Sequence, residues 1–330
     1  MLVIYLAIFG GTEKYMSENN KACIARKTSI GGQALIEGIM MRGPKKSAMA
    51  VRNPQGEMVL ETWDNEPADK KPGLIDKLRK VPVVRGVFNF AITLISGYKS
   101  LMKSAEIAGF EDEDEKESSK GMMAVVGVVA SVLGICLSVG LFILLPTFLY
   151  DLVAKLLPAI AGNRILKSVF EGVLKIAILV AYMAAVSKMK DIERTFRYHG
   201  AEHKTIFCYE AGLELTVENV RKQGRFHPRC GTSFLIVMLL VSIFIGMIIP
   251  PELPTLIRTL IKVLLLPLTM GIGYEFIKFA GRHENAFTKI LSAPGLWMQR
   301  ITVLEPDDSM IECAITAVKE VIPDDGSDLI

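Results

Sequence analysis

The sequence carries little charge, and what it carries is nearly balanced. Only 22% of its 330 residues are Asp, Glu, Lys or Arg, and 38 basic residues offset 35 acidic ones to leave a net charge of +3. No basic cluster is interleaved with aromatic residues, which argues against nucleic acid as a partner. In contrast, 51% of the residues are hydrophobic, a composition that indicates several membrane spans.

Cysteine is also scarce, and several familiar motifs are missing. The five cysteines (Cys23, Cys136, Cys208, Cys230 and Cys313) are an odd, scattered set without a CxxC pair. This set argues against a disulfide framework and for a reducing compartment. Neither GxxxxGK[ST] nor GxGxxG occurs, so the two common phosphate-binding loops are excluded. The apolar residues 1–10 are too few to span a bilayer and lack the basic segment of a signal peptide.

Four apolar segments are long enough to be transmembrane helices. They cover residues 122–150, 165–187, 233–250 and 255–279. Basic residues concentrate outside them, with 18 in the first 121 residues and nine in 188–232. Because cytoplasmic loops retain Lys and Arg, we expect a multi-pass membrane protein with both termini and the 188–232 loop in the cytoplasm.

The segments outside the spans predict a small α+β portion. After a variable segment, 1–28, the glycines of 29–81 indicate short extended pieces and tight turns, and 47–63 reads as a β-hairpin with its turn at Asn53–Gly56. Residues 82–109 predict an amphipathic helix lying on the membrane rather than crossing it, and an acidic linker follows to 121. The C-terminal segment, 280–330, predicts a strand at ITVLEP and then a helix N-capped by Asp307 or Asp308.

The stretch His199-Gly200-Ala201-Glu202-His203 has the HxxEH spacing of the inverted zinc-protease signature. On a helix, residues four apart share a face about 6 Å apart, so both imidazoles reach one metal ion and Glu202 stands beside them as a base. Helicity is expected through AEHKTIFCYEA, and Gly212 is expected to end it.

A catalytic zinc needs a third protein ligand. Glu210 shares the histidine face but lies seven residues beyond His203, roughly 10 Å of helix rise, which is too far for one ion. The local candidates are His227 and Cys230 in FHPRC, followed by His283 and Glu284 after the last span. Cys208 falls in an apolar run off the histidine face, so we interpret it as a small buried residue.

Three interpretations of these residues remain open. The first is an open zinc site that activates water, and the second is a closed structural zinc held by His199, His203, His227 and Cys230. The third is that the histidines only face lipid headgroups. In the second span, the charged stripe Lys167, Glu171, Lys175 either faces the protein interior or marks the membrane boundary.

Five motifs, in order, resemble those of the YqhQ-like family, bacterial polytopic membrane proteins of unknown function that are labelled predicted metal-dependent enzymes. They are GGQALIEGIMMRGP, FRYHGAEHKTI, RFHPRCGTSF, YEFIKFAGRH and APGLWMQRIT, within residues 29–310. The resemblance implies roles for residues inside these motifs. They are Glu37, Arg42, His199, Glu202, His203, His227, Arg229, Cys230, Arg282 and His283.

The sequence therefore predicts a mainly α, polytopic membrane protein with about four spans. The favoured function is a metal-dependent hydrolase in which His199, His203 and one of His227, Cys230 or His283 hold Zn²⁺. Glu202 would be the general base, and Arg42, Arg229 or Arg282 would neutralise an anionic substrate group. The alternative is a non-catalytic scaffold for membrane-protein insertion or envelope assembly, with a membrane-protein partner and at most a structural zinc.

Overall fold

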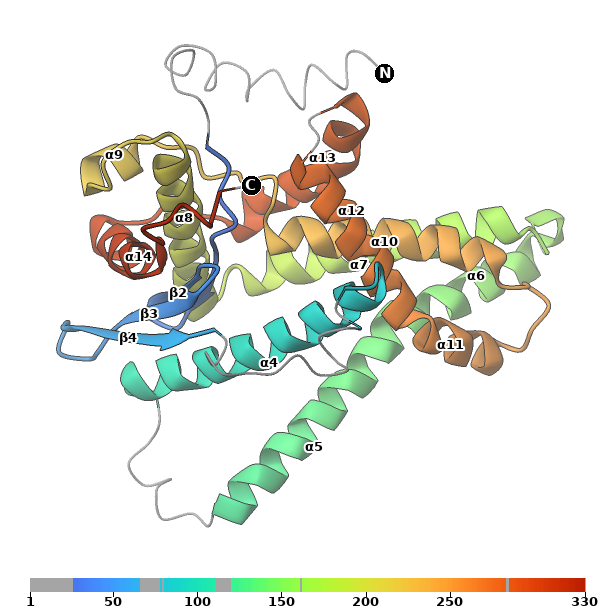
Figure 1. Cartoon of the computed structure of the whole chain (residues 1–330). Coiled ribbons are helices and arrows are strands. Elements are labelled where there is room, and N and C mark those ends of the chain that lie inside the picture. The colour runs from blue at the N-terminus through green and yellow to red at the C-terminus, as the bar shows by residue number, and fades with distance from the viewer. Residues whose placement is uncertain are drawn as a thin grey trace. The chain divides into compact units, whose positions relative to one another are not determined.

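The computed structural model describes residues 26–65, 78, 80–110, 120–160, 162–282 and 285–329, most of which are helical (Figure 1). Two compact units are built from interleaved parts of the chain. The described parts of 1–68, 193–227 and 303–330 form the first, and those of 69–192 and 228–302 form the second. The predictions for residues 1–10 and 111–119, and for His283 and Glu284, lie outside the described residues.

The first unit contains a four-stranded antiparallel sheet whose strands follow chain order. They are β1 (Gly31–Leu35), β2 (Gly38–Arg42), β3 (Lys46–Arg52) and β4 (Met58–Asp64). The predicted hairpin is confirmed: it is β3 and β4, and Gly56, at φ 82, donates its N–H to the carbonyl of Asn53 at 2.9 Å. The glycine-rich stretch forms the β1–β2 pair, as its short extended pieces predict.

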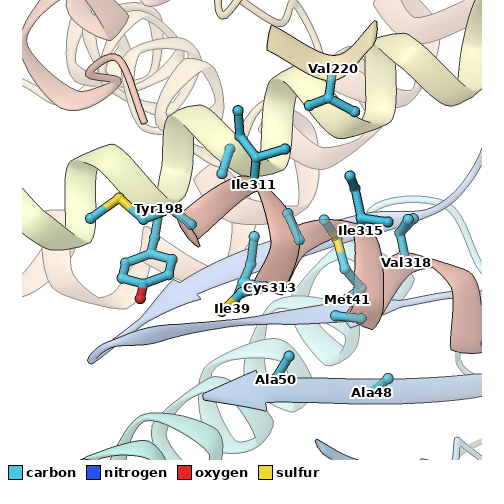
Figure 2. Packing of buried hydrophobic residues seen from close by; sticks show 14 of the residues in the cluster. Ile39, Met41, Ala48, Ala50, Tyr198, Val220, Ile311, Cys313, Ile315 and Val318 are labelled. Atoms are coloured by element: carbon cyan, nitrogen blue, oxygen red, sulfur yellow. The ribbon is translucent and has the colours of Figure 1, made fainter. Parts of the chain in front are cut away.

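Helix α14 (Asp308–Val321) covers one face of this sheet by packing on β2 and β3. Across those strands, Ile39 pairs with Ala50 and Met41 with Ala48, so each large side chain lies opposite a small one. Figure 2 shows Ile39 and Met41 of β2 gathered in one cluster with Ile311, Cys313, Ile315 and Val318 of α14. All of these residues are fully or almost fully buried, and they form the hydrophobic core of the first unit.

The start of α14 agrees with the prediction from the sequence, whereas the segment before it does not. The predicted N-cap is confirmed, because the carboxylate of Asp307 accepts the N–H of Met310 at 3.0 Å. The predicted strand at ITVLEP is wrong. Ile301 and Thr302 end helix α13, and 303–307 is an irregular crossing segment in which the Leu304 N–H donates to the carbonyl of Phe196 at 3.0 Å. That single bond does not form a ladder, so the β-branched residues of this stretch do not make a strand.

The second unit is a bundle in which α10 packs against α7, α12 and α13, while α4 packs against α12. Its helices are α4 (Val84–Ile107), α5 (Lys120–Val139), the π-helical η2 (Gly140–Leu144), α6 (Leu145–Leu156), the 3₁₀ turn η3 (Pro158–Ile160), α7 (Arg164–Val186), α10 (Gly231–Ile248), α11 (Thr255–Leu264), α12 (Leu266–Arg282) and α13 (Ala286–Thr302). The amphipathic helix predicted over 82–109 is therefore formed, as α4.

Three helical stretches among the described residues are long and apolar enough to cross a membrane: Gly127–Leu156, Arg164–Val186 and Gly231–Ile248. They match three of the four predicted spans, although the first runs to Leu156. The fourth prediction, one helix over 255–279, is wrong in its continuity, because Thr255–Leu264 and Leu266–Ala280 meet at a 45° bend. Pro267, the second residue of α12, explains the break, since proline lacks an N–H and its ring clashes with the carbonyl four residues earlier.

The bundle has an inverted polarity compared with a water-soluble protein. Leu256, Leu260 and Leu264 of α11 are 68%, 54% and 77% exposed, whereas Arg258 and Thr259 of the same helix are buried. The stripe in the second predicted span behaves likewise, since Lys167, Glu171 and Lys175 are all buried. The interior interpretation of that stripe is confirmed. Leucine outside and charge inside is the pattern of helices whose outer faces contact lipid.

Candidate metal centre

Helix α8 (Lys190–Glu210) carries both histidines of the HxxEH motif. The rings of His199 and His203, one turn apart, have centroids 4.4 Å from each other. His203 is buried and His199 is half-buried. The helix ends at Glu210 and Gly212 follows at φ 67, so both the helical placement of the two histidines and the predicted stop are confirmed.

The backbone of the loop after α9 (Val217–Arg221) orients the ring of His203. Nδ1 of His203 lies 2.6 Å from the carbonyl oxygen of Arg225. A carbonyl only accepts, so this contact is a hydrogen bond only when Nδ1 carries the proton. Nε2 then keeps its lone pair, which is the arrangement found in metal-ligating histidines.

The same loop ends at Cys230, the N-cap of α10, whose sulfur accepts the N–H of Thr232 at 3.5 Å. One ligand atom each of His199, His203 and Cys230 lies within 4.8 Å of the others. Cys230 follows His227 by only three residues, so the chain tethers it within about 10 Å of that residue. A tetrahedral zinc with bonds of ~2.0 to 2.3 Å spaces its ligands by about 3.5 Å. Two imidazoles and a thiol at these distances therefore fit zinc after small side-chain movements.

His227 is buried beside this group but is turned to another partner. Its ring centroid lies 5.6 Å from that of His203, and its Nε2 is 3.7 Å from Oε2 of Glu210. The other oxygen of that carboxylate accepts the N–H of Thr28 at 2.8 Å. Glu210, which the sequence excluded as a ligand for the histidine pair, thus lies next to His227 instead. No motif spacing pointed to this contact, because it joins the last residue of α8 to a loop 17 residues further on.

Glu202 lies beside the two histidines around α8 and reaches strand β1. Its Oε1 accepts the N–H of Gly32 at 3.0 Å, and a Cβ on residue 32 would lie only 3.0 Å from the carboxyl carbon of Glu202. The glycine therefore permits this close approach. Burial raises the pKa of Glu202, against the opposing effects of His199 and of the Gly32 N–H. A buried carboxyl with a raised pKa is a stronger base once ionised.

The other residues predicted for the site are located only by the elements that carry them. Arg42 is the last residue of β2 and pairs with Gly31 of β1. The next residue of β1, Gly32, is the one whose N–H donates to Glu202. Arg229 lies between His227 and Cys230 in the loop, and Arg282 is the last residue of α12. Glu37 serves the fold, because both of its carboxylate oxygens accept hydrogen bonds from Arg194 of α8. That bidentate pair ties the β1–β2 turn to the helix that carries the histidines.

Two cations fasten the histidine-bearing helix and its loop to one carboxylate. The ammonium of Lys204, a buried residue of α8, pairs with Glu305 and also donates to the carbonyl of Arg221 at 2.8 Å. Arg225 pairs with Glu305 at 3.2 Å. Arg225 thus contributes twice: its carbonyl orients His203, and its side chain pairs with Glu305. Sequence reasoning missed Lys204 and Glu305, since an isolated lysine and glutamate give no pattern.

Comparison with known proteins agrees with the motif resemblance. Residues 81–324 match the family described as "Protein of unknown function (DUF1385)". A Bacillus subtilis (strain 168) protein described as "Uncharacterized protein YqhQ" is 33% identical over 302 residues, which cover 89% of this chain and 92% of that relative. No solved structure matches. The chain therefore belongs to the DUF1385 family, to which the YqhQ-like resemblance had pointed.

Proposed function

We propose that the protein is a membrane-embedded, metal-dependent enzyme, a hydrolase, with Zn²⁺ held by His199, His203 and Cys230. The observation that carries this proposal is the hydrogen bond between Nδ1 of His203 and the carbonyl of Arg225, next to the group of three ligand atoms. A histidine that merely faced headgroups would not need a ring fixed by the backbone beside a second imidazole and a thiol. Two nitrogens and one sulfur are a donor set that zinc uses in catalytic sites.

Different residues have different roles in the proposed reaction. When bound, Zn²⁺ supplies a Lewis acid that activates water. Glu202, buried on the same helix, accepts the proton of the attacking water, and the Gly32 N–H fixes the rotamer of its carboxylate. Arg42 and Arg229 neutralise an anionic group of the substrate. The half-buried His199 leaves an entry to the centre that His203 does not.

The second candidate is a non-catalytic scaffold in which the metal is structural and a membrane-protein partner docks on the unit. The position of His227 favours it, because a buried imidazole 5.6 Å from His203 is near enough to become a fourth ligand after a side-chain rotation. Four protein ligands close a zinc site and leave no place for water. The two candidates therefore differ in one countable property, the number of protein ligands.

Cobalt substitution separates the two candidates. We would replace the bound metal with Co²⁺ in the purified full-length protein, record its visible spectrum and add azide. An open site binds azide and its spectrum shifts, whereas a closed four-ligand site does not respond. Loss of the sulfur-to-cobalt charge-transfer band in Cys230→Ser identifies the thiolate, and Cys313→Ser is the matched control because Cys313 lies in the core. Absence of stoichiometric metal in the wild type refutes both metal candidates.

The two-unit organisation supports a definite membrane topology. A compact unit lies on one side of a bilayer, so the segments that leave and re-enter the first unit cross an even number of times. Residues 69–192 hold two candidate spans, which leaves α4 on the surface. Residues 228–302 hold Gly231–Ile248 and the bent pair, so the pair crosses as one broken span. The excess of basic residues assigns the first unit to the cytoplasm, as expected for a multi-pass inner-membrane protein.

Epitope tags test this topology in intact cells. Tags inserted after Asp64, after Gly109 and at the C-terminus should be reached by antibody only after the membrane is permeabilised. A tag after Gly162, between the first two candidate spans, should be reached from outside. If the tags after Asp64 and Gly109 fall on opposite sides, α4 crosses the membrane and the assigned topology is wrong.

A further inference from the structure

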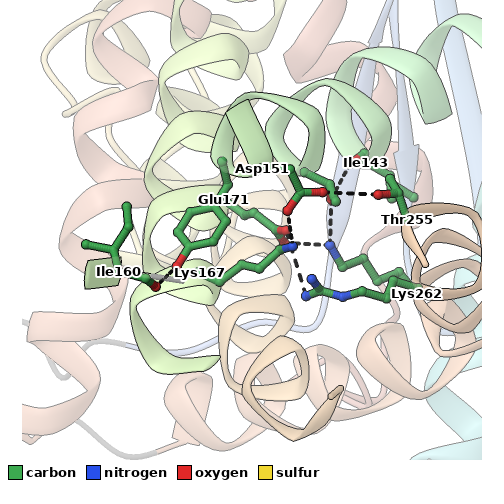
Figure 3. A network of polar contacts seen from close by, with 10 residues as sticks. Ile143, Asp151, Ile160, Lys167, Glu171, Thr255 and Lys262 are labelled. Atoms are coloured by element: carbon green, nitrogen blue, oxygen red, sulfur yellow. Dashed lines mark hydrogen bonds and ion pairs between the residues drawn. The ribbon is translucent and has the colours of Figure 1, made fainter. Parts of the chain in front are cut away.

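Six charged side chains gather inside the second unit, on three helices. Asp151 belongs to α6, and two of the cations, Arg258 and Lys262, belong to α11. The other three are Lys167, Glu171 and Lys175, one turn apart along α7. Figure 3 shows the side chains of Asp151, Lys167, Glu171 and Lys262 converging on one another. This cluster takes no part in the proposed hydrolytic centre.

Both acidic residues of the cluster are already engaged. Asp151 pairs with Lys167, and its second oxygen accepts the hydroxyl of Thr255 at 3.1 Å. Glu171 pairs with Lys262 at 2.5 Å, and Lys262 also donates to the hydroxyl of Thr147 at 2.9 Å. Each carboxylate thus has its own ammonium partner, although Oε1 of Glu171, which faces Arg258, has no hydrogen-bond partner among the described residues. Within each pair the two charges cancel, so the two pairs contribute no net charge.

Arg258 is left over from this pairing. Its side chain is 2% exposed, and its Nη2 lies 4.0 Å from Glu171, beyond hydrogen-bond distance. Its Nε and Nη1 have no hydrogen-bond partner among the described residues. Lys175, also buried, is a second cation for which no carboxylate of the cluster remains. A guanidinium does not lose its proton in proteins, so the charge of Arg258 persists however deep it lies.

Four cations against two carboxylates leave the interior of the bundle with an excess positive charge. A buried charge without a partner strongly destabilises the folded protein. An anion that fills the vacant donors removes this destabilisation. Guanidinium and ammonium groups converging on one point are the donors that proteins use for phosphate.

A hollow borders the cluster at one end of the bundle. Its volume is about 250 Å³, and Asp151 and Lys167 of the cluster line it together with Tyr150, Lys155 and Pro251. Lys167 is the fourth residue of α7 and Lys175 the twelfth, so the charged stripe runs from the hollow to a depth of about 12 Å along the helix. Pro251 follows α10 closely, which places the hollow where the helices end.

We propose that this cluster is a binding site for a phosphate group, with Arg258 as its central donor and the hollow at Lys167 as its entrance. Phosphate offers several acceptor oxygens to the donors that the two carboxylates leave vacant. The phosphate is either that of an anionic lipid headgroup, whose chains would lie against the exposed leucines of α11, or a free phosphate ion. The chemistry of recognition is the same for both sources.

The test uses full-length protein in a maltoside detergent and a buffer free of phosphate. Thermal unfolding is followed with inorganic phosphate, with short-chain phosphatidic acid and with diacylglycerol, which lacks the phosphate. We expect phosphatidic acid, phosphate or both to raise the melting temperature, and diacylglycerol to leave it unchanged. A response to phosphatidic acid alone identifies a lipid as the source, whereas a response to inorganic phosphate shows that the free ion suffices.

The decisive variant is Arg258→Met, which keeps most of the side-chain volume and removes the charge. Without ligand it should be at least as stable as the wild type, because an unpaired buried cation is gone. Its apparent affinity for the effective phosphate compound should be weaker by about tenfold or more. Lys278→Met on α12 is the matched control, since Lys278 lies outside the cluster.

Three results would overturn the proposal. The first is a wild type that responds to neither phosphate compound. The second is an Arg258→Met protein that responds as the wild type does. The third is a large loss of stability in Arg258→Met without ligand, which would show that the guanidinium is a structural partner of Glu171 alone. Lys175→Met repeats the affinity comparison from the second cation, and a variant that responds as the wild type does would count against the proposal in the same way.

Discussion

The carbonyl oxygen of Leu304 occupies the position that a side chain on residue 200 would need. A β-carbon built on Gly200 would lie 1.9 Å from that oxygen and 3.1 Å from the carbonyl carbon. Glycine lowers helix propensity, and from the sequence alone its place between His199 and His203 looks unfavourable. The structure supplies the reason for it, since the segment that leads into α14 crosses α8 against this bare backbone.

Replacing Gly200 with alanine should therefore destabilise the first unit. The helix gains propensity, but the Leu304 backbone must move away, and overpacking of this kind costs on the order of 1 to 3 kcal/mol. Chemical denaturation of the purified protein, monitored by the fluorescence of Trp63 on β4, measures the change. Gly224→Ala is the matched control, because a Cβ there meets no atom within 4 Å. Equal stability of the two variants would contradict the close contact.

Removal of the metal should loosen the same region. If zinc joins α8 to the segment that ends at Cys230, a strong chelator lowers the melting temperature of the wild type. His203→Ala should already have the lower melting temperature and should not respond to the chelator. His227→Ala separates the two candidate sites, because it keeps the metal in the three-ligand site and weakens its binding in the four-ligand one. A wild type unaffected by chelation would argue against any bound metal.

The helix cap at Asp307 should make stability depend on pH in the acid range. Partial burial opposes ionisation of Asp307, but hydrogen bonds from Ser309 and from the Met310 N–H outweigh it and lower the pKa. A depressed folded-state pKa stabilises the protein above the unfolded-state value, and this contribution disappears as the pH falls through the folded-state value. Asp307→Ala should cost about 1 kcal/mol near neutral pH and progressively less toward pH 3. A pH-independent cost in denaturant titrations would contradict this account.

Two cysteines in the core should react slowly with alkylating reagents. Burial raises the pKa of Cys208 and of Cys313 to about 11. Because the thiolate is the reactive form, their alkylation near pH 8 should be roughly two orders of magnitude slower than that of a free thiol. The rate should keep rising with pH beyond 9, where an ordinary thiol levels off. Mass spectrometry of iodoacetamide-treated protein reports both sites, and full reaction in denaturant is the control.

What the sequence predicted correctly in this protein is local. The hairpin at Asn53–Gly56, the cap at Asp307 and the placement of His199 and His203 on one helix each follow from a few neighbouring residues whose backbone preferences decide the structure. The burial of Cys208 followed from its apolar neighbours in the same way. Periodicity and capping are short-range effects, so a single sequence contains them.

What the sequence did not predict depends on distant contacts or on competition between local effects. The partners of Glu202 and Glu37 come from segments more than 150 residues away, and no spacing rule links them. The strand expected at 301–306 does not form, because its first two residues belong to α13 and only Leu304 makes a backbone hydrogen bond, to Phe196. The bend at Leu265 was hidden by uniform hydrophobicity, although Pro267 was the signal for it.

The interleaved first unit also sets the order in which the protein is completed during synthesis. Strands β2 and β3 leave the ribosome before α14, which covers Ile39 and Met41 and is made after every other helix that the structure describes. The candidate spans between them are made before that helix exists. The nascent β2–β3 pair must therefore keep an apolar face uncovered until α14 is made, and a chain truncated before Asp308 would leave this face permanently open to aggregation or to a chaperone.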